Sequence, residues 1–546
     1  MKTLIADYVI VGAGTAGCVL ANRLSEDPQV EVILIEAGER DRHPFIHVPA
    51  GFVRLLDHPS VTWRYHTEAN AHTSHREILF PRGRGLGGSS AINGLLYVRP
   101  FAEDIDSWET AGARGWNFAD CLPHYSRSET WTEGRSPQRG TDGPIKVSRV
   151  QNPPEICGAA VAAARQAGLE FLDDPNSTTR GPSIWYYQQT RDGRRRSSAA
   201  RGYLRPVMGR PNLKVLTGLQ VSKLEFSGTR VTGVHAMTAS AEPCVISARR
   251  EVISCAGVIG TPRLLELSGI GDKDVLDNAG IRTRVALPGV GANLQDHYVV
   301  RLGFRVRGAG TANERSHGLA LAREMMRYAV SGTGVLTYSA ALVGGFVQTR
   351  YASRPDVQLV IAPGSFAAGR IGVLESEPGI SCGVWQMRPE SRGHVHIRSK
   401  EVQDSPAIAP AYLSDERDCA TTVEGLRIGR NIFAQPEIAR FIVDETVPGR
   451  AADSDAQLLQ YARDNGSTVY HAVGTCRMGE DRMSVVDADL RVHGVSGLRV
   501  VDASVMPTIT STNTNATVLM IAERAAQMIR SSAITGVTEQ RVKETI

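Results

Sequence analysis

Three glycines near the beginning of the chain have a spacing that suits phosphate binding. Gly12, Gly14 and Gly17 form a G-x-G-x-x-G turn between the β-branched run 8–11 and the apolar segment 18–24. In such a turn the first glycine permits a sharp bend, the second lets a pyrophosphate approach the backbone, and the third lets the helix pack closely on the strand. The free amides and the dipole at the helix start then face the anion, so the turn predicts a bound dinucleotide.

A carboxylate stands at the end of the next apolar run. Residues 30–35 are typical of a second buried strand, and Glu36 follows them directly. A carboxylate at this place can accept hydrogen bonds from a ribose diol. The turn and Glu36 do not distinguish FAD from NAD, so on these residues alone a nicotinamide-dependent dehydrogenase stays an alternative.

A second glycine cluster covers residues 81–94, with the sequence PRGRGLGGSSAING. Glycine at this density favours close approach of the backbone to a ligand, and Ser89 and Asn93 can add polar contacts. The alternative is a plain surface loop. A nicotinamide-dependent dehydrogenase does not account for this cluster, which favours FAD as the dinucleotide.

With these segments the sequence resembles the glucose-methanol-choline (GMC) oxidoreductases, especially their bacterial choline dehydrogenase-like and alcohol dehydrogenase branch. The resemblance runs nearly end to end and rests also on residues 257–271, 287–297 and 468–517. It implies an FAD cofactor. Some family members tether FAD covalently through a histidine immediately before the asparagine of the second glycine cluster, whereas this chain has Ile92 there. We therefore expect non-covalent FAD.

The resemblance also implies which residues contact FAD. In the family the second glycine cluster lies against the flavin and its pyrophosphate, and the segment around Asp502 contacts the ribityl-pyrophosphate part. The backbone at Val221, which we expect within a strand over residues 215–224, meets the adenine. The expected cofactor-binding set is Gly12, Gly14, Thr15, Ala16, Gly17, Glu36, Ala37, Arg82, Gly87, Gly88, Ser89, Asn93, Gly94, Leu95, Val221, Asp502, Ala503 and Thr514.

The expected catalytic pair lies near the C-terminal end. A lone histidine is usually structural, but His471 is flanked by small residues in a strand-to-loop segment, and the catalytic histidine of the family falls at this position. Asn513 matches a position where members carry histidine or asparagine beside it. The resemblance implies that His471 takes the hydroxyl proton of an alcohol, that Asn513 donates to the oxygen, and that the hydride passes to flavin N5. Thr514 or Asn515 is expected to cap a helix over residues 518–529.

The substrate and the electron acceptor are less defined by the sequence. We expect a small, primary alcohol, with a quinone or another carrier as acceptor; an oxygen-using oxidase is the first alternative. A relative that keeps FAD without net redox chemistry, such as a hydroxynitrile lyase-like enzyme, is the second. Ala472 replaces the proline common at that position, and a quaternary ammonium needs an aromatic cage that a chain with 6% aromatic residues does not reveal. Choline itself is therefore doubtful.

These residues require an α/β scaffold. The strand–turn–helix start and the run 250–257 predict a Rossmann-type FAD-binding domain with a parallel sheet. Residues 341–349, 356–361, 383–387 and 394–397 are typical of antiparallel strands, and the resemblance implies that this sheet, flanked by helices, forms the substrate domain. We expect an N-terminal FAD part over 1–300, the substrate domain over 301–465, and a return to the FAD domain over 466–546 that carries the catalytic pair.

Composition excludes several other functions. The net charge of +4 over 546 residues predicts no nucleic-acid partner, and the short basic run 191–196 is expected to be a solvated loop. The eight cysteines form no C-x-x-C pair, so no metal site is expected, and a reduced, cytoplasmic protein fits this usage. No stretch is apolar enough to span a bilayer, although peripheral membrane contact stays possible.

Overall fold

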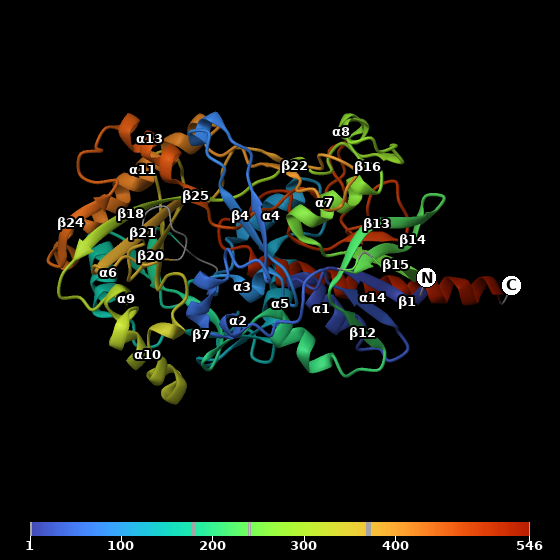
Figure 1. Ribbon diagram of the computed structural model, residues 1–546, viewed down its shortest axis with the longest axis horizontal. Coiled ribbons are helices and arrows are strands. Elements are labelled where there is room, and N and C mark those ends of the chain that lie inside the picture. Colours follow the sequence, from blue (N-terminus) through green and yellow to red (C-terminus); the bar gives the residue numbers. More distant parts are fainter. Residues whose placement is uncertain (1–2, 177–180, 239, 241, 367–372, 545–546) are drawn as a thin grey trace.

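In the computed structural model the strand runs of the sequence form a mainly parallel sheet (Figure 1). The structure describes residues 3–176, 181–238, 240, 242–366 and 373–544, and the side chains of the last helix up to Ser532. The strand order of the parallel sheet is β12–β2–β1–β15–β14–β13, with β26 beside β15. Neighbours among β12, β2, β1, β15 and β26 run parallel, whereas β14 and β13 are antiparallel additions. The bounds are β1 Thr3–Val11, β2 Val32–Ile35, β12 Leu213–Leu216, β13 Leu219–Ser227, β14 Arg230–Thr238, β15 Pro243–Ser254 and β26 Leu498–Val500.

The prediction of one continuous strand over residues 215–224 is wrong. The backbone breaks at Gly218, which has a φ of +69° and donates its N–H to the oxygen of Gly38 at 2.9 Å. Because this left-handed conformation interrupts the ladder, Leu216 ends one strand and Leu219 begins the next. Val221 still lies in a strand, within β13.

A second sheet, antiparallel except for β8, which runs parallel to β9, forms the opposite part of the molecule (Figure 1). Its strand order is β24–β18–β21–β20–β19–β9–β8, with β25 beside β18. Helix α11, with the amphipathic pattern of a core-facing helix, packs on β21 and β18, and α6 packs beside α11. The bounds are β8 Glu170–Phe171, β9 Ser183–Tyr186, β18 Tyr298–Val306, β19 Val343–Val347, β20 Val357–Ala362, β21 Gly379–Gln386, β24 Ile442–Val447, β25 Ser467–Thr468, α6 Glu155–Gln166 and α11 Glu416–Phe433.

The combination of parallel and antiparallel sheets with helices confirms the expected α/β fold class. The antiparallel sheet also contains β8 and β9, and α6 packs on it, although all three elements precede residue 301. The expected strand over 394–397, β22, pairs with β23 in a separate small sheet instead of joining this one. The three-part division at residues 300 and 465 stays a prediction.

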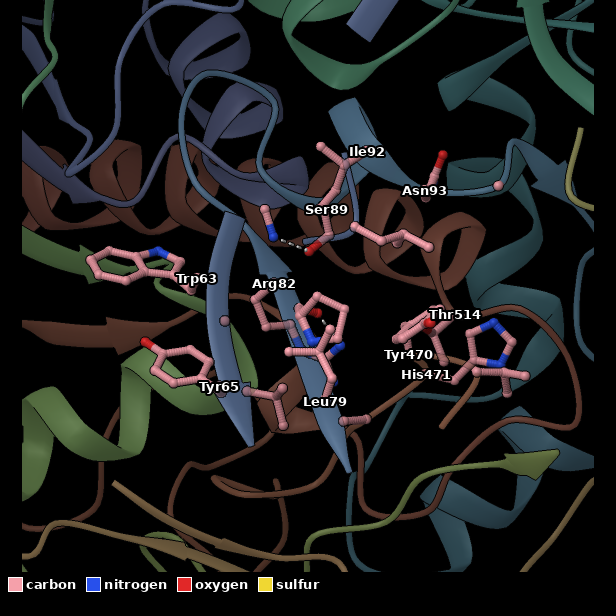
Figure 2. A pocket seen from close by; sticks show the side chains of 18 of the residues that line it. Trp63, Tyr65, Leu79, Arg82, Ser89, Ile92, Asn93, Tyr470, His471 and Thr514 are labelled. Atoms are coloured by element: carbon pink, nitrogen blue, oxygen red, sulfur yellow. Dashed lines mark hydrogen bonds between the residues drawn. The ribbon is translucent and has the colours of Figure 1, made fainter. Parts of the chain in front are cut away.

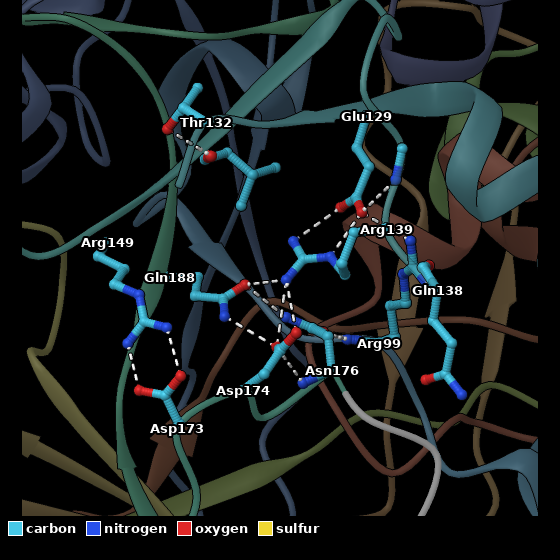
Figure 3. A network of polar contacts seen from close by, with 12 residues as sticks. Arg99, Glu129, Thr132, Gln138, Arg139, Arg149, Asp173, Asp174, Asn176 and Gln188 are labelled. Atoms are coloured by element: carbon cyan, nitrogen blue, oxygen red, sulfur yellow. Dashed lines mark hydrogen bonds and ion pairs between the residues drawn. The ribbon is translucent and has the colours of Figure 1, made fainter. Parts of the chain in front are cut away.

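A smaller sheet with the order β11–β10–β7–β6, and β5 beside β10, contains a buried charge cluster (Figure 3). Glu129 accepts hydrogen bonds from Arg99 Nη2 at 2.7 Å and from Arg139 Nε at 2.6 Å, and Arg139 Nη1 also donates to Gln188 Oε1 at 2.7 Å. Asp174 lies 3.1 Å from Arg139. The strand bounds are β5 Leu96–Tyr97, β6 Glu129–Trp131, β7 Ile145–Arg149, β10 Gln188–Asp192 and β11 Arg195–Arg196.

The last helix crosses the molecule beside the first one. α14 packs on α1 and α5. It begins at Asn515, three residues before the expected start at residue 518, so Asn515 is its first residue, and it continues well past the expected end at residue 529. Within the described part of the chain, no helix combines the length and the apolar character needed to cross a membrane.

The remaining strands and α-helices have the following bounds: β3 Thr62–His66, β4 Leu79–Gly83, β16 Ile270–Gly271, β17 Val285–Ala286, β22 His394–His396, β23 Ala407–Ala409, α1 Thr15–Leu24, α2 Pro44–His47, α3 Ser89–Ile92, α4 Ala102–Thr110, α5 Phe118–Ser128, α7 Gly257–Leu267, α8 Lys273–Asn278, α9 Ala312–Arg315, α10 Gly318–Ser331, α12 Pro436–Ala439, α13 Asp455–Asn465 and α14 Asn515–Glu544.

Candidate active site

A cavity of about 880 Å³ is lined by residues of both large sheets and by the second glycine cluster. Figure 2 shows side chains from this lining, among them Arg82, Ser89, Ile92 and His471. The sequence-predicted residues that line it are Gly12, Gly14, Thr15, Ala16, Glu36, Ala37, Arg82, Gly88, Ser89, Asn93, Gly94, Leu95, Val221, His471, Asp502, Ala503, Asn513 and Thr514. Gly17 and Gly87 lie behind the lining.

The first glycine turn has the backbone geometry that its spacing predicts. Gly12 has a φ of +100°, and a Cβ there would lie 2.5 Å from the oxygen of Cys255. A Cβ on Gly17 would lie 1.9 Å from the oxygen of Gly12, so Gly17 shapes the turn from behind. A Cβ on Gly14 would meet nothing closer than the oxygen of Cys255 at 4.0 Å. The backbone at Gly14 is therefore accessible from the cavity, as the approach of a pyrophosphate requires.

The two glycine segments are in direct contact. Gly87, with a φ of +91°, donates its N–H to the oxygen of Ala13 at 2.8 Å. A Cβ on Gly88 would lie 2.7 Å from the Cα of Gly14. A side chain at either position would thus be strained by backbone conformation, by crowding, or by both. The glycines allow the second cluster to lie against the first turn and to place α3 at the cavity.

Glu36 joins these segments through its carboxylate. Oε2 accepts the N–H of Ala13 at 2.9 Å, and Oε1 accepts the N–H groups of Gly38 and Gly85 at 2.8 and 2.9 Å. Burial raises the pKa of this carboxyl, and the three backbone N–H bonds oppose that rise. The sequence suggested a ribose contact for Glu36; the carboxylate also lines the cavity, and its bonds within the protein were not foreseen.

The prediction that the basic run 191–196 forms a solvated loop is wrong at the two ends of the run. Arg191 and Arg196 are buried, because the run forms a hairpin of β10 and β11 against the core. Arg196 Nη1 donates to the backbone oxygen and to Oδ1 of Asn93 at 2.7 and 2.6 Å, and its Nε donates to the oxygen of Ile46 at 3.0 Å. Burial lowers the pKa of Arg196 to about 9. This arginine holds the end of α3 that faces the cavity.

Ile92, next to Asn93, presents an aliphatic side chain at the cavity wall. It is buried in a small cluster with Ile46, Leu55, Val61 and Ala91 and also lines the cavity. An aliphatic carbon chain offers no nucleophile to a cofactor. The position that carries the covalent link in some relatives of the expected family therefore cannot make one here.

Asp502, in the wall of the cavity, caps the start of α7. Its Oδ2 accepts the N–H of Gly257 at 2.9 Å and the hydroxyl of Thr261 at 2.6 Å. Burial raises the pKa of Asp502. Nearby, the hydroxyl of Thr15 donates to Oδ1 of Asn515 at 2.9 Å, which joins the first helix to the last. These contacts bring the segment around Asp502 and the catalytic-pair segment onto the glycine turn.

His471 is held in place by its own backbone. Its N–H donates to Oδ1 of Asp296 at 2.8 Å, and Oδ2 of the same carboxylate accepts the hydroxyls of Thr468 and Tyr412, each at 2.5 Å. Tyr470, immediately before it, has a φ of +68°, a conformation that a tyrosine seldom adopts. Asp296 therefore fixes a bent segment that turns the His471 ring into the cavity.

A chain of hydrogen bonds defines the protonation of that ring. The Met387 carbonyl can accept only, so Nε2 of His297, 2.8 Å away, carries the proton. Burial lowers the pKa of His297 to about 4, so the ring is neutral and its Nδ1 is an acceptor. Nδ1 of His471 lies 3.0 Å from that atom and must donate to it. Nε2 of His471 therefore keeps its lone pair, and it accepts from the amide of Asn513 at 3.0 Å.

Electrostatics keep His471 neutral. Burial is the largest cause, and His297 and Arg82 add to it; together they hold the pKa of His471 well below the usual 6.5. The predicted pair, His471 and Asn513, is thus brought into contact as expected. A role for His297 was not predicted, because its contact with His471 joins residues 174 positions apart in the sequence. The signal that could have found it is the adjacent pair of polar residues Asp296 and His297.

The cavity fits a large, polar cofactor with an anionic part. Arg82 Nη2 and Asn513 Oδ1 are buried polar atoms without a hydrogen-bond partner among the described residues, and both residues line the cavity. Buried polar atoms normally have partners, so such atoms at a cavity wall indicate a ligand. The open backbone at Gly14, the helix start that follows it, and the guanidinium of Arg82 suit a pyrophosphate-bearing dinucleotide.

Comparison with known proteins agrees with this geometry. Residues 6–299 and 389–522 match the family models of the N- and C-terminal GMC oxidoreductase regions. The chain is 39% identical to an oxygen-dependent choline dehydrogenase of Cronobacter sakazakii, over 96% of this chain and 95% of the relative, and 38% identical to an alcohol dehydrogenase [acceptor] of Pseudomonas putida with the same coverage.

The similarity extends to solved structures. The crystal structure of pyridoxine 4-oxidase from Mesorbium loti superposes with a TM-score of 0.87 at 31% identity, covering 96% of this chain and 99% of that one. The family matches span most of the sequence, and the fold and the cavity agree with them. The chain belongs to the GMC oxidoreductase family, whose members are FAD-binding flavoproteins and among which its relatives act on alcohols.

Proposed function

We propose that this protein oxidises a small, primary alcohol to the aldehyde, with His471 as the base. FAD, when bound, accepts the hydride at N5. The chain must remove the hydroxyl proton, orient the alcohol and exclude water. A positioned imidazole contributes roughly 10²- to 10⁴-fold to such a reaction.

The observation that carries this proposal is the lone pair on Nε2 of His471. It results from the Met387–His297–His471 chain and lies beside the amide of Asn513. A substrate hydroxyl can replace the Asn513 amide at Nε2 and donate its proton there, and the N–H of Asn513 that it displaces then donates to the alcohol oxygen. As the proton leaves, the oxygen gains charge, and the amide stabilises that charge without a change in its own.

We assign the cofactor contacts to the predicted set that lines the cavity, from Gly12 to Thr514, and the mode of binding as non-covalent because of Ile92. Gly17 and Gly87 support these contacts from behind. The assignment is tested by denaturation in trichloroacetic acid: a non-covalent flavin is released into the supernatant, whereas a covalent one precipitates with the protein.

A neutral alcohol is favoured over a quaternary ammonium. Of the carboxylates in the described cavity wall, Glu36 and Asp502 are bonded to backbone N–H groups at the nucleotide end, Glu375 accepts the hydroxyl of Ser365 at 2.7 Å, and Glu77 is exposed. The hydrogen-bond network of His471 contains the carboxylate of Asp296. Its two oxygens already accept hydrogen bonds from one backbone N–H and two hydroxyls. That network therefore lacks the negative charge of a trimethylammonium site, although aromatic rings such as Trp385 and Tyr470 line the same cavity.

For the second half-reaction we propose a quinone or another carrier, as in a dehydrogenase. Support comes from the alcohol dehydrogenase [acceptor] among the relatives, whereas the choline dehydrogenase is named as oxygen-dependent. An alcohol oxidase is the second candidate, because the pyridoxine oxidase is similar over its whole length.

The test is an anaerobic panel of alcohols mixed with the purified yellow protein, followed by admission of oxygen. Primary alcohols should bleach the flavin, choline should do so far more slowly, and reoxidation by oxygen should be slow compared with reoxidation by a soluble quinone. In His471→Ala the bleaching rate should fall by roughly 10²-fold or more. His394→Ala, an exposed histidine on β22, is the matched control and should keep the wild-type rate.

Two results would overturn the proposal. If His471→Ala bleached at the wild-type rate, the base would be another group. If no alcohol bleached the wild-type flavin, the protein would be a non-redox relative of the family.

A further inference from the structure

Helix α10, Gly318–Ser331, exposes large apolar side chains to an unusual degree. Leu319 is 90% exposed, Val330 83%, Met326 69% and Met325 57%. Single exposed apolar residues are ordinary on a protein surface, but a group of them on one helix indicates an interaction site. Figure 1 shows α10 at the edge of the molecule, away from the parallel sheet.

The exposed residues form a stripe with helical periodicity. Met326 follows Leu319 by seven residues and Val330 follows Met326 by four, so the three side chains lie on one line along an α-helix. The opposite side of the helix packs on the protein through Glu324 and Tyr328. Glu324 is buried and accepts the N–H of Val335 at 2.9 Å, and the Tyr328 hydroxyl donates to the oxygen of Arg194 at 2.8 Å.

The polarity of α10 is therefore reversed relative to an ordinary surface helix. Its polar side chains anchor it to the protein, and its apolar stripe points outward. Burial of apolar side chains is favourable roughly in proportion to the area removed from water, so a surface that covers these three would be stabilised by them. The core does not need this stripe, because Glu324 and Tyr328 already fix the helix.

Positive charge flanks the stripe. Arg323 and Arg327 follow Leu319 by four and eight residues and lie along one side of it, Arg315 precedes the helix, and Arg194 Nη1 donates to the oxygen of Ala329 at 2.7 Å. The carboxylates in this stretch have partners within the protein: Glu324 is buried and lies 3.7 Å from Nη1 of Arg327, and Glu314 accepts the N–H and hydroxyl of Thr311. Arg323 is therefore the main cation beside the stripe. The outward face of α10 is thus apolar and cationic.

We propose that α10 docks on an anionic lipid surface, with Leu319, Met326 and Val330 inserted among the acyl chains and the arginines at the headgroups. An apolar stripe bordered by basic residues is the pattern of an interfacial helix. A second copy of this chain suits the surface less well, because a symmetric contact would bring Arg323 and Arg327 of both copies together. The proposal does not depend on the identity of the base or of the substrate.

The test is flotation of the holoenzyme with vesicles of phosphatidylcholine alone or mixed with phosphatidylglycerol. The wild-type protein should float with the anionic vesicles, much less with pure phosphatidylcholine, and less at high salt. The triple variant Leu319→Gln, Met326→Gln and Val330→Gln should lose at least 10-fold of the bound fraction, and Arg323→Glu should lose part of it. Val443→Gln, which changes a 49% exposed residue on β24, should bind like the wild type.

All variants should keep the wild-type rate of flavin reduction in solution, which shows that they are folded. The proposal is overturned if the wild-type protein does not float, or if the triple variant floats as well as the wild type. It is also overturned if light scattering shows a dimer that the triple variant dissociates, since α10 would then contact a second copy. Failure of flotation with normal flavin bleaching would leave the proposed enzymatic function intact.

Discussion

At the scale of single residues, the chemistry depends on a proton that is placed by a neighbouring side chain. His471 has its lone pair on Nε2 because Nδ1 is committed to His297, and His297 is committed to the Met387 carbonyl. Among the described residues, the hydrogen-bond partners of the two rings are each other, the Met387 carbonyl and the Asn513 amide, none of which is charged. In the proposed reaction the base is therefore defined by hydrogen-bond direction, and we propose that His297 acts through His471 as a positioning residue.

Replacing His297 should separate this effect from folding. In His297→Phe the Nδ1–H of His471 loses its acceptor, so the ring can move its proton to Nε2 and the base is lost in that fraction. We expect flavin reduction to slow by at least 10-fold, within the roughly 10²- to 10⁴-fold that a general base contributes. The rate is measured anaerobically in stopped flow at saturating alcohol.

The control is His297→Asn, whose amide oxygen can accept from Nδ1 in place of the ring nitrogen. It should recover most of the rate lost in His297→Phe. Equal losses in both variants would mean that His297 only fills space.

The pH profile reports the same site. His471 reacts in its neutral form, which is present above its pKa and is lost as the pH falls through it. Burial, with His297 and Arg82, holds that pKa well below 6.5. The acid limb of kcat/KM should therefore lie well below pH 6.5, with a flat profile from pH 8 down through 6.5. A limb at about 6.5, the value of an exposed imidazole, would contradict the assignment.

At the scale of elements, the site depends on how two glycine segments and a short helix are held together. Glu36 bonds to both glycine segments, and Arg196 bonds to the end of α3 at Asn93. These contacts join residues far apart in the chain, and they present backbone groups to the cofactor. The elements are thus fixed by buried charged side chains rather than by packing alone.

Removing the Arg196 clamp should weaken cofactor binding. In Arg196→Met the oxygens of Asn93 and Ile46 lose a buried donor, and α3 is no longer fixed at the cavity. A hydrogen bond to a charged group contributes about 1.5–3 kcal/mol, so we expect FAD to bind at least 10-fold more weakly, measured from the flavin retained after dialysis. Arg195→Met, the exposed neighbour on β11, should retain FAD like the wild type. Equal retention in both variants would contradict the role of Arg196.

Much of this site could be predicted from the sequence, and the reason is local. The glycine turn depends on residues within a few positions of one another, so spacing describes it well, whereas the meaning of Ile92 came from the family resemblance. Arg196 could not be predicted, because its partner Asn93 is 103 residues away and a basic run is usually solvated. His297 is similar: a tertiary contact, and not a local pattern, gives it a role.

The strands show the same limit. β19 and β20 were predicted nearly in full because they alternate or run apolar between turns. The break at Gly218 was missed, since one glycine within an apolar run is compatible with a continuous strand, and the hydrogen bond to Gly38 that favours the break joins distant residues. The boundary at residue 300 rests on order along the chain, whereas β8 and β9 enter the antiparallel sheet from before it.

At the scale of the whole molecule, a buried charge network lies at the smaller sheet that contains β6 and β10. Glu129 is fully buried and accepts hydrogen bonds from two buried arginines, Arg99 and Arg139 (Figure 3). Arg139 continues the network to Asp174 and Gln188. A buried ion pair contributes little net stability as a pair, but the loss of one partner leaves a charge without compensation.

We therefore expect Glu129→Gln to lower the free energy of unfolding by about 3–5 kcal/mol. Denaturant unfolding of the holoprotein measures the change, provided that the transition is reversible. The control is Asp173→Asn, which removes an exposed pair with Arg149 and should cost less than about 1 kcal/mol. A change as small in Glu129→Gln as in Asp173→Asn would show that the network tolerates the loss.

The contact of the first helix with the last also constrains the order of events during synthesis. Residues 12–17 leave the ribosome early, whereas His471, Asn513 and the strand β26 that completes the parallel sheet leave it late. A nascent chain can thus present its dinucleotide turn long before the base arrives, and the wall that Asp502 and Thr514 provide is still missing at that stage. Cofactor capture and the onset of activity are expected to be late, post-translational events, and a ribosome stalled before residue 500 should hold a chain that neither retains flavin nor oxidises alcohol.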